Sequence, residues 1–304
     1  MNTKTLVPNR PCRPTALGAG ILLTIGLLSG SARVAAQGPE LAIQKAILLD
    51  WPVTESQYVP VTADSAVGPW RPLLKPIVRQ DDRYQVALPA DSGHALFSLV
   101  EGVYECEDFS GSALSDWTQI AGTPDSGGIV GSRTAGGALR IQDNGTGWPL
   151  VGFFLTDSPC TDFVMSVDLV EWSGDENSVI LGRGDVDTPS GVFGALTVNW
   201  HDRGVPGEGI LWLWEGSKFD GVEPANFILQ VDPAVDYRLV LSGAGSRLTL
   251  TLYALPDTAT PVVPPISFVT ARQQGVLSFA VEGDEWNGQL DLTVDNLHAV
   301  GVAP

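Results

Sequence analysis

Apolar and polar residues alternate in short runs along most of the chain, and Gly, Pro, Asp and Ser separate these runs. No run keeps an apolar period of three to four residues over the length of an ordinary helix. Short runs with a period of two, bounded by turn residues, are typical of β-strands. The pattern therefore predicts an all-β protein whose strands fall into two stretches, residues 41–100 and residues 104–304.

The first stretch is predicted to form a small antiparallel β-module, either a sandwich or a meander. About 60 residues is marginal for a stable core, so we expect this module to pack against the larger one. Its five predicted strands are Leu41–Leu49, Gln57–Thr62, Trp70–Leu73, Arg83–Leu88 and Ala95–Leu99.

The second stretch is long enough to bury a substantial core. Twelve strands without a helix predict two sheets of about six strands each, a two-sheet jelly-roll sandwich. The four prolines of residues 256–265 exclude a central strand there and predict a surface crossing. The predicted strands are Leu139–Ile141, Val151–Leu155, Phe163–Glu171, Ser178–Gly182, Ala195–Trp200, Gly209–Trp214, Ala225–Leu229, Asp236–Ser242, Arg247–Tyr253, Ile266–Val269, Gly275–Ala280 and Gln289–Val300.

Both stretches resemble known families. The motifs Leu49–Pro52, Tyr58–Val59, Trp70–Pro72 and Gly93–Leu99 resemble a short immunoglobulin- or fibronectin-like repeat of secreted bacterial proteins. That resemblance implies a spacer without chemistry of its own.

In the second stretch, an ordered set of motifs is similar to the concanavalin A-like lectin/glucanase superfamily, and most of all to laminin-G-like members from exported bacterial proteins. The resemblance implies a lectin-like jelly roll, often associated with glycans and sometimes holding a structural calcium. The motifs are Asp108–Gly111 with Trp117, Phe163–Asp168, Tyr237–Val240 with Arg247–Tyr253, and Val294–Asn296.

Residues 1–36 have the order of a secretory signal. Lys4, Arg10 and Arg13 precede an apolar stretch, Ala16–Leu28, and small residues follow at Val34–Ala36. Cleavage after Ala36 is expected, which would make the protein secreted, periplasmic or attached to the cell surface. An uncleaved anchor is the alternative, although the stretch is shorter than the ~20 residues of a membrane span.

The chain is strongly acidic, with 35 Asp and Glu against 17 Lys and Arg and a net charge of −18. Removing residues 1–36 leaves 13 basic residues against 35 acidic ones, a net charge of −22. Binding to nucleic acid or to an anionic membrane requires basic patches, so the composition argues against both partners. No later segment is apolar and long enough to span a membrane.

Two cysteines remain after cleavage, Cys106 and Cys160. In an oxidising compartment such a pair predicts a disulfide, which would contribute about 4 kcal/mol on the loop-entropy model. Two separate buried thiols are the alternative.

Enzyme signatures are missing from the sequence. The chain has no Gly-x-Ser-x-Gly and no His-Glu-x-x-His motif. Glycoside hydrolysis needs two carboxylates facing one cleft. Asp168 and Glu171 are three apart and would point to opposite faces of a strand unless a bulge intervenes, and Asp284 and Glu285 are adjacent. Structural acids fit this pattern better than a catalytic pair.

Aromatic residues are the better candidates for a site, because sugar rings stack on exposed indoles. Within residues 211–214, leucines and tryptophans occupy opposite faces of one strand, and one face must be core. If the leucines are core, the tryptophans are available to a ligand. The alternative is that the tryptophans are core. The predicted ligand-binding residues are Asp168, Trp172, Trp200, Asp202, Trp212 and Trp214.

Three further residues near the two ends of the second stretch are candidate metal ligands. Asp108, Asp295 and Asn296 would meet if the terminal strands are neighbours, and their oxygens suit a structural calcium. The alternative is that their side chains cap strand ends as Asx turns.

Together these observations favour an exported, non-enzymatic β-sandwich protein that binds a polysaccharide or another surface component. Two alternatives stay open. One is a purely structural or adhesion module without a sugar site, and the other is a glycoside hydrolase or lyase on the same fold.

Overall fold

The computed structural model describes most of the chain after residue 45, and every regular element in it is a β-strand. The predicted signal segment lies outside the described residues. These are 46–52, 58–67, 70–73, 78–80, 83–89, 96–107, 130–134, 137–143, 150–154, 159–173, 177–184, 190–198, 207–217, 222–258, 260–283, 290–302 and 304.

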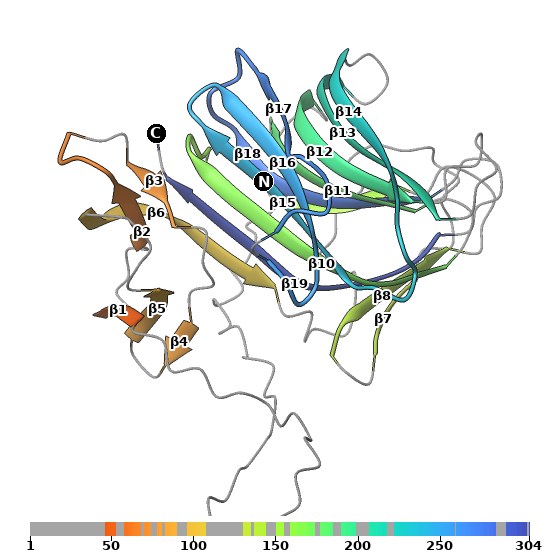
Figure 1. Ribbon diagram of the computed structural model, residues 1–304, viewed down its shortest axis with the longest axis horizontal. Helices are drawn as coiled ribbons and strands as arrows, with labels where there is room; N and C mark the ends of the chain where they lie inside the picture. Colours follow the sequence, from red (N-terminus) through yellow and green to blue (C-terminus); the bar gives the residue numbers. More distant parts are fainter. Residues whose placement is uncertain are drawn as a thin grey trace, which may run out of the picture.

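The first five strands lie at one end of the molecule, and β6 runs from that end along the sandwich (Figure 1). β1, β5 and β4 form a three-stranded antiparallel sheet, while β2 pairs with β3 and with the first half of β6. Their bounds are β1 Ala46–Pro52, β2 Tyr58–Ala63, β3 Arg71–Pro72, β4 Val78–Gln80, β5 Arg83–Pro89 and β6 Leu96–Glu107.

The remaining strands, together with β6, β2 and β3, form two larger sheets. The path β17-β16-β15-β10-β19-β6-β2-β3, with β8 beside β19 and β7 beside β8, makes a ten-stranded sheet, and β14-β13-β12-β11-β18-β9 makes a six-stranded sheet. The bounds are β7 Val130–Arg133, β8 Leu139–Asp143, β9 Leu150–Phe154, β10 Phe163–Ser173, β11 Asn177–Gly184, β12 Ser190–Val198, β13 Glu208–Ser217, β14 Val222–Gln230, β15 Tyr237–Ala244, β16 Arg247–Ala254, β17 Ile266–Val269, β18 Val276–Gly283 and β19 Leu290–Val302.

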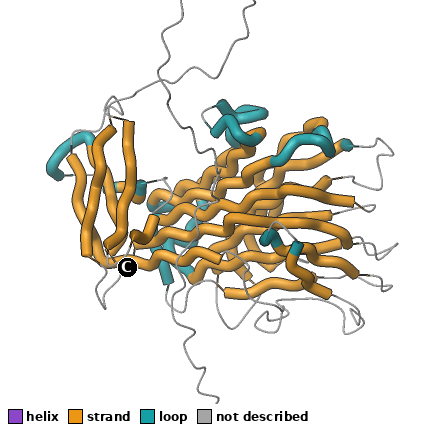
Figure 2. The backbone as a smooth tube through the Cα atoms, turned by 90° about the horizontal axis from the view of Figure 1, so that it is seen from below, coloured by secondary structure: helices purple, strands orange, loops and turns teal. Residues whose placement is uncertain are grey.

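The main hydrophobic core lies between these two sheets, which Figure 2 shows as stacked layers of strands. Alternation decides which side chains enter it. In β15, Tyr237, Leu239 and Leu241 are buried and the residues between them are half-buried. Leu211 and Leu213 of β13 fill the core from the opposite sheet. The all-β, two-sheet sandwich predicted from the sequence is therefore confirmed.

The two large sheets contain ten and six strands, whereas about six strands were predicted for each. β7 was not predicted, and neither was β4. β8, β6, β2 and β3 all extend the sheet that contains β19. Periodicity identifies strands one at a time, and it carries no information about which of two sheets a strand joins.

β6 crosses the predicted boundary between the two stretches. Its first half pairs with β2 through Leu96–Glu101, and its second half pairs with β19 through Gly102–Glu107. A second hydrophobic cluster joins Trp51, Val59 and Leu73 to Val300 of β19. The first strands thus contact the sandwich, as their small size led us to expect, while the division into 41–100 and 104–304 stays a prediction.

Candidate functional site

β13 separates its leucines from its tryptophans. Leu211 and Leu213 are fully buried in the main core, so Trp212 and Trp214 project from the outer face of the six-stranded sheet. The register places Phe193 of β12 opposite Trp214. The outward residues of β12, β13 and β14 include Phe193, Thr197, Trp212, Trp214, Asn226 and Ile228, and we call these six the tryptophan face.

Trp214 contacts the two other aromatic rings of this face. Its ring centroid lies 4.9 Å from that of Phe193, which it stacks on, and 4.8 Å from that of Trp212, to which it is tilted. Trp214 is only 5% exposed, because it belongs to a small hydrophobic cluster outside the main core. Trp212 packs against the same cluster but is only half-buried. Of the two indoles, Trp212 is therefore the one that a ligand could contact.

Hydroxyl groups continue the face next to Trp212. The indole Nε1 of Trp212 donates to Thr197 Oγ1 at 3.1 Å, and Thr197 Oγ1 is 2.7 Å from Ser178 Oγ. Ser178 lies opposite Glu282 of β18 in the register. This hydrogen-bonded row fixes the plane of the indole ring, which is how a rigid stacking platform is held.

β14 provides the open rim of the tryptophan face. Asn226 lies opposite Trp212 and Ile228 lies opposite Ile210, and both β14 residues are exposed. The amide Nδ2 of Asn226 donates to Glu223 Oε1 at 2.7 Å. Amide and carboxylate groups around an apolar surface are the rim chemistry expected of a small-ligand site.

Asp168 lies elsewhere, on β10 in the ten-stranded sheet. Its carboxylate is buried and accepts from Arg238 Nε at 2.6 Å and Arg238 Nη2 at 2.7 Å. Asn296 Nδ2 also donates to it, at 3.0 Å. The hydrogen bonds that Arg238 donates to Asp168 raise the pKa of Arg238 above its usual value. The structure does not bring Asp168 to the tryptophan face.

Trp172 does not join the tryptophan face either, because it enters the main core, where its ring centroid is 5.9 Å from that of Tyr237. The cause is a register shift between Leu169 and Glu171 of β10, which reverses the alternation. Trp200 and Asp202 lie outside the described residues. Of the six predicted ligand-binding residues, the structure brings together Trp212 and Trp214.

The same shift places Asp168 and Glu171 on one face of β10, the condition set above for a carboxylate pair. Both oxygens of Asp168 are nevertheless occupied by the Arg238 guanidinium. A carboxylate held bidentately is poorly placed to transfer a proton to a glycosidic oxygen. Asp284 and Glu285 lie outside the described residues. The described part of the chain therefore gives glycoside hydrolysis no support at this position.

Asp295 and Asn296 lie at a β-bulge within β19. Between Ser166 and Asp168 the register with β10 shifts, and Asn296 has a positive φ of 49°. The backbone N–H of Asn296 donates to Asp295 Oδ1 at 2.8 Å. Asp108 lies outside the described residues, and among those described no group of three or more His, Cys, Asp or Glu is arranged to hold a metal. The calcium site stays a prediction.

The two cysteines lie at different positions along β19. Cys106 of β6 is opposite His298, whereas buried Cys160 lies against Gly301, three residues further on. Three residues of strand span roughly 10 Å, and a disulfide joins Cα atoms up to about 7 Å apart. Pairing would require the end of β6 to shift, and the disulfide stays a prediction.

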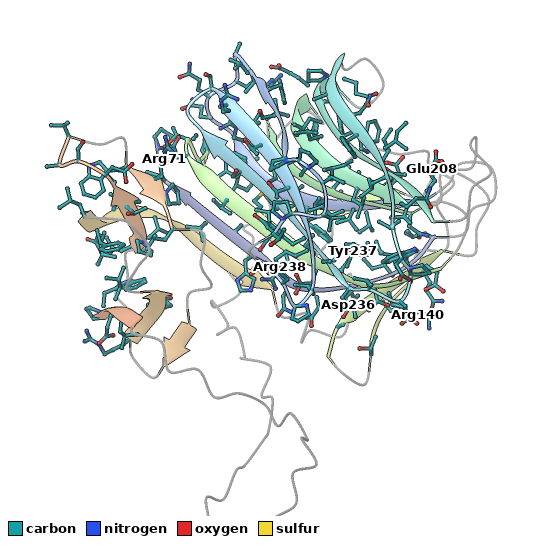
Figure 3. The ribbon with its side chains drawn as sticks, in the orientation of Figure 1. Arg71, Arg140, Glu208, Asp236, Tyr237 and Arg238 are labelled. Atoms are coloured by element: carbon teal, nitrogen blue, oxygen red, sulfur yellow. The ribbon has the colours of Figure 1, made fainter. Side chains whose placement is uncertain are left out.

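His298 is a residue that sequence reasoning did not select. Its ring lies on the outer face of β19, and its Nδ1 is buried without a hydrogen-bond partner. Burial and, secondarily, the charge of Arg238 lower the pKa of His298 to about 4, with Asp168 opposing. Figure 3 labels Arg238 in this sheet. One histidine among unrelated neighbours gives no sequence signal for such a cluster.

Comparison with known proteins gives only distant likenesses. No family model matches the chain, and no curated protein matches it. Among solved structures, the chain is similar to the carbohydrate binding module CBM66 from Bacillus subtilis, with 17% identity over 60% of this chain and 91% of that one, at a TM-score of 0.39.

Two other solved structures are similar at the same level. A Bacillus licheniformis beta-glucanase has 11% identity over 67% of this chain and 98% of that one, with a TM-score of 0.42. Peanut lectin has 8% identity over 67% of this chain and 100% of that one, with a TM-score of 0.43. The fold described above rests on the strand pairing of this chain alone. In its described residues, no helix has the length and apolarity needed to cross a membrane.

Proposed function

We propose that this protein is an exported, non-catalytic carbohydrate-binding protein that holds a sugar ring against Trp212. The observation that carries the proposal is the position of Trp212, which is half-buried on the outer face of the six-stranded sheet and fixed through Nε1 to Thr197. Residues 41–100 then act as a spacer.

The surroundings of Trp212 supply what a sugar requires. A pyranose ring has an apolar face, which an indole covers, and hydroxyls at its edge, which need donors and acceptors. Asn226 lies opposite Trp212, and its amide is held by Glu223 at the rim. Ile228 adds apolar surface beside them.

A glycan-array screen of the purified chain tests the proposal directly. Trp212→Ala should lower affinity for any glycan that binds by about tenfold or more, because a single aromatic anchor often dominates such a contact. Because Trp212 lies outside the main core, the variant should keep the circular-dichroism spectrum of the folded protein.

Phe227→Ala is the matched control. Phe227 is an exposed aromatic residue on β14 and lies opposite Leu211, so its side chain belongs to the other face of the same sheet. Its removal should leave glycan binding unchanged. If Trp212→Ala binds as tightly as the unaltered protein, or if the array shows no binding, the proposal is wrong.

A further inference from the structure

We infer that the tryptophan face selects uncharged glycans and rejects glycans that carry carboxylates, an inference that rests on the proposed function. The starting observation is the charge of the six-stranded sheet. Its strands contain one basic residue, Arg183, and four acidic residues, Glu208, Glu215, Glu223 and Glu282.

Arg183 is not available to a ligand on this face. Its side chain is fully buried inside the sandwich, where Nη1 donates to the carbonyl oxygen of Thr161 at 2.8 Å. The guanidinium carbon also lies 5.1 Å from the ring centroid of Phe163. The strands that carry the tryptophan face therefore provide no cation for a uronate or sulfate group.

One of the four carboxylates is placed at the rim of the tryptophan face. Glu223 is exposed, and its Oε1 accepts a hydrogen bond from Asn226, the residue opposite Trp212. Glu282 is buried on β18, three strands away from Trp212. A sugar stacked on Trp212 would therefore lie beside the exposed carboxylate of Glu223.

A carboxylate on that sugar would meet a like charge at Glu223. Near a protein surface, two charges several ångströms apart repel strongly enough to change affinity by an order of magnitude, and salt screens the repulsion.

The test uses three pairs of polymers that differ mainly in carboxylation. These are hydroxyethyl cellulose and carboxymethyl cellulose, methyl-esterified polygalacturonan and polygalacturonate, and mannan and polymannuronate. Affinity electrophoresis of the full chain at low ionic strength should show at least about tenfold weaker retardation by the carboxylated member of any pair that binds. Raising the salt to about 0.5 M should narrow that difference.

Glu223→Gln tests the cause without touching the core. It should reduce the discrimination by at least about two- to threefold at low salt, because the negative charge at the rim beside Trp212 is removed. Glu171→Gln is the matched control, since it removes the same charge from an exposed position on the other sheet, and it should leave the discrimination unchanged.

The outcomes separate the two claims. Equal or tighter binding of a carboxylated polymer at low salt overturns the inference and leaves carbohydrate binding intact, as does a discrimination that Glu171→Gln and Glu223→Gln reduce equally. Binding to none of the six polymers overturns the proposed function together with the inference.

Discussion

The lowered pKa of His298 makes the stability of the protein depend on pH. In an unfolded chain a histidine titrates near pH 6.5, whereas burial and Arg238 hold the pKa of His298 at about 4 in the folded protein. Between these two values the unfolded state binds a proton that the folded state does not. The free energy of unfolding must therefore fall as the pH falls from about 6.5 towards 4.

We expect a loss of about 1.6 kcal/mol between pH 6.5 and pH 5.0, somewhat below the limit of 1.36 kcal/mol per pH unit for one group, because the unfolded histidine is only half protonated at pH 6.5. Urea unfolding at the two pH values measures it. This window lies above the range in which most carboxylates titrate, so the histidine dominates.

The control for this effect is His298→Gln, which keeps a polar side chain and removes the titration. Its free energy of unfolding should change little between pH 6.5 and pH 5.0. A variant that loses as much stability as the unaltered protein over this window would assign the pH dependence to other groups.

At the scale of the single element, the bulge within β19 places a strained residue, Asn296, next to the buried ion pair of Asp168 and Arg238. Asn296 has a positive φ and donates to Asp168. Asn296→Ala removes both the tolerance for this backbone and the hydrogen bond, and should lower the free energy of unfolding by about 3 kcal/mol. Asn296→Gly removes only the bond and should cost about 1 to 2 kcal/mol.

Chemical denaturation of the two variants at neutral pH gives this comparison. The difference between them isolates the backbone strain, since both lack the amide. Equal stability of the Gly and Ala variants would show that the left-handed conformation costs nothing here. An unchanged stability of Asn296→Ala would show that neither the backbone conformation nor the hydrogen bond of Asn296 stabilises the protein.

The strands show what a sequence can and cannot predict. In β13 the alternation is regular, so it was clear in advance that leucines and tryptophans would separate, though not which would be core. In β10 the alternation breaks after Leu169. No residue type marks that shift, and it alone sends Trp172 into the core and away from the other predicted ligand-binding residues.

The candidate site was also predictable only in part, namely for the two residues that lie on one strand. Two adjacent tryptophans on one strand face were a usable signal, and they do lie together. Their partners Thr197, Ser178 and Asn226 come from three other strands, and the order of strands in the sheet is a long-range property. Likewise, Trp214 is covered by Phe193 only because β12 lies beside β13.

At the scale of the whole molecule, β6 makes the two parts of the chain depend on each other. Gly102 lies where β6 passes from β2 to β19, and a Cβ at this position would collide with the carbonyl oxygen of Gly301 and with Val59. The close approach of three strands therefore requires glycine. The hydrophobic cluster formed by Trp51, Val59, Leu73 and Val300 covers the same crossing.

We therefore predict that the full chain unfolds in a single calorimetric transition and that Gly102→Val lowers its midpoint by about 5 °C or more while keeping one transition. The added side chain must separate the strands, at a cost of about 2 kcal/mol. Leu99→Val is the control, because Leu99 is exposed on the same strand away from the crossing, and its midpoint should stay within about 1 °C. Two resolved transitions, or a Gly102→Val midpoint equal to that of Leu99→Val, would mean that the first strands fold independently of the sandwich and that β6 only links them.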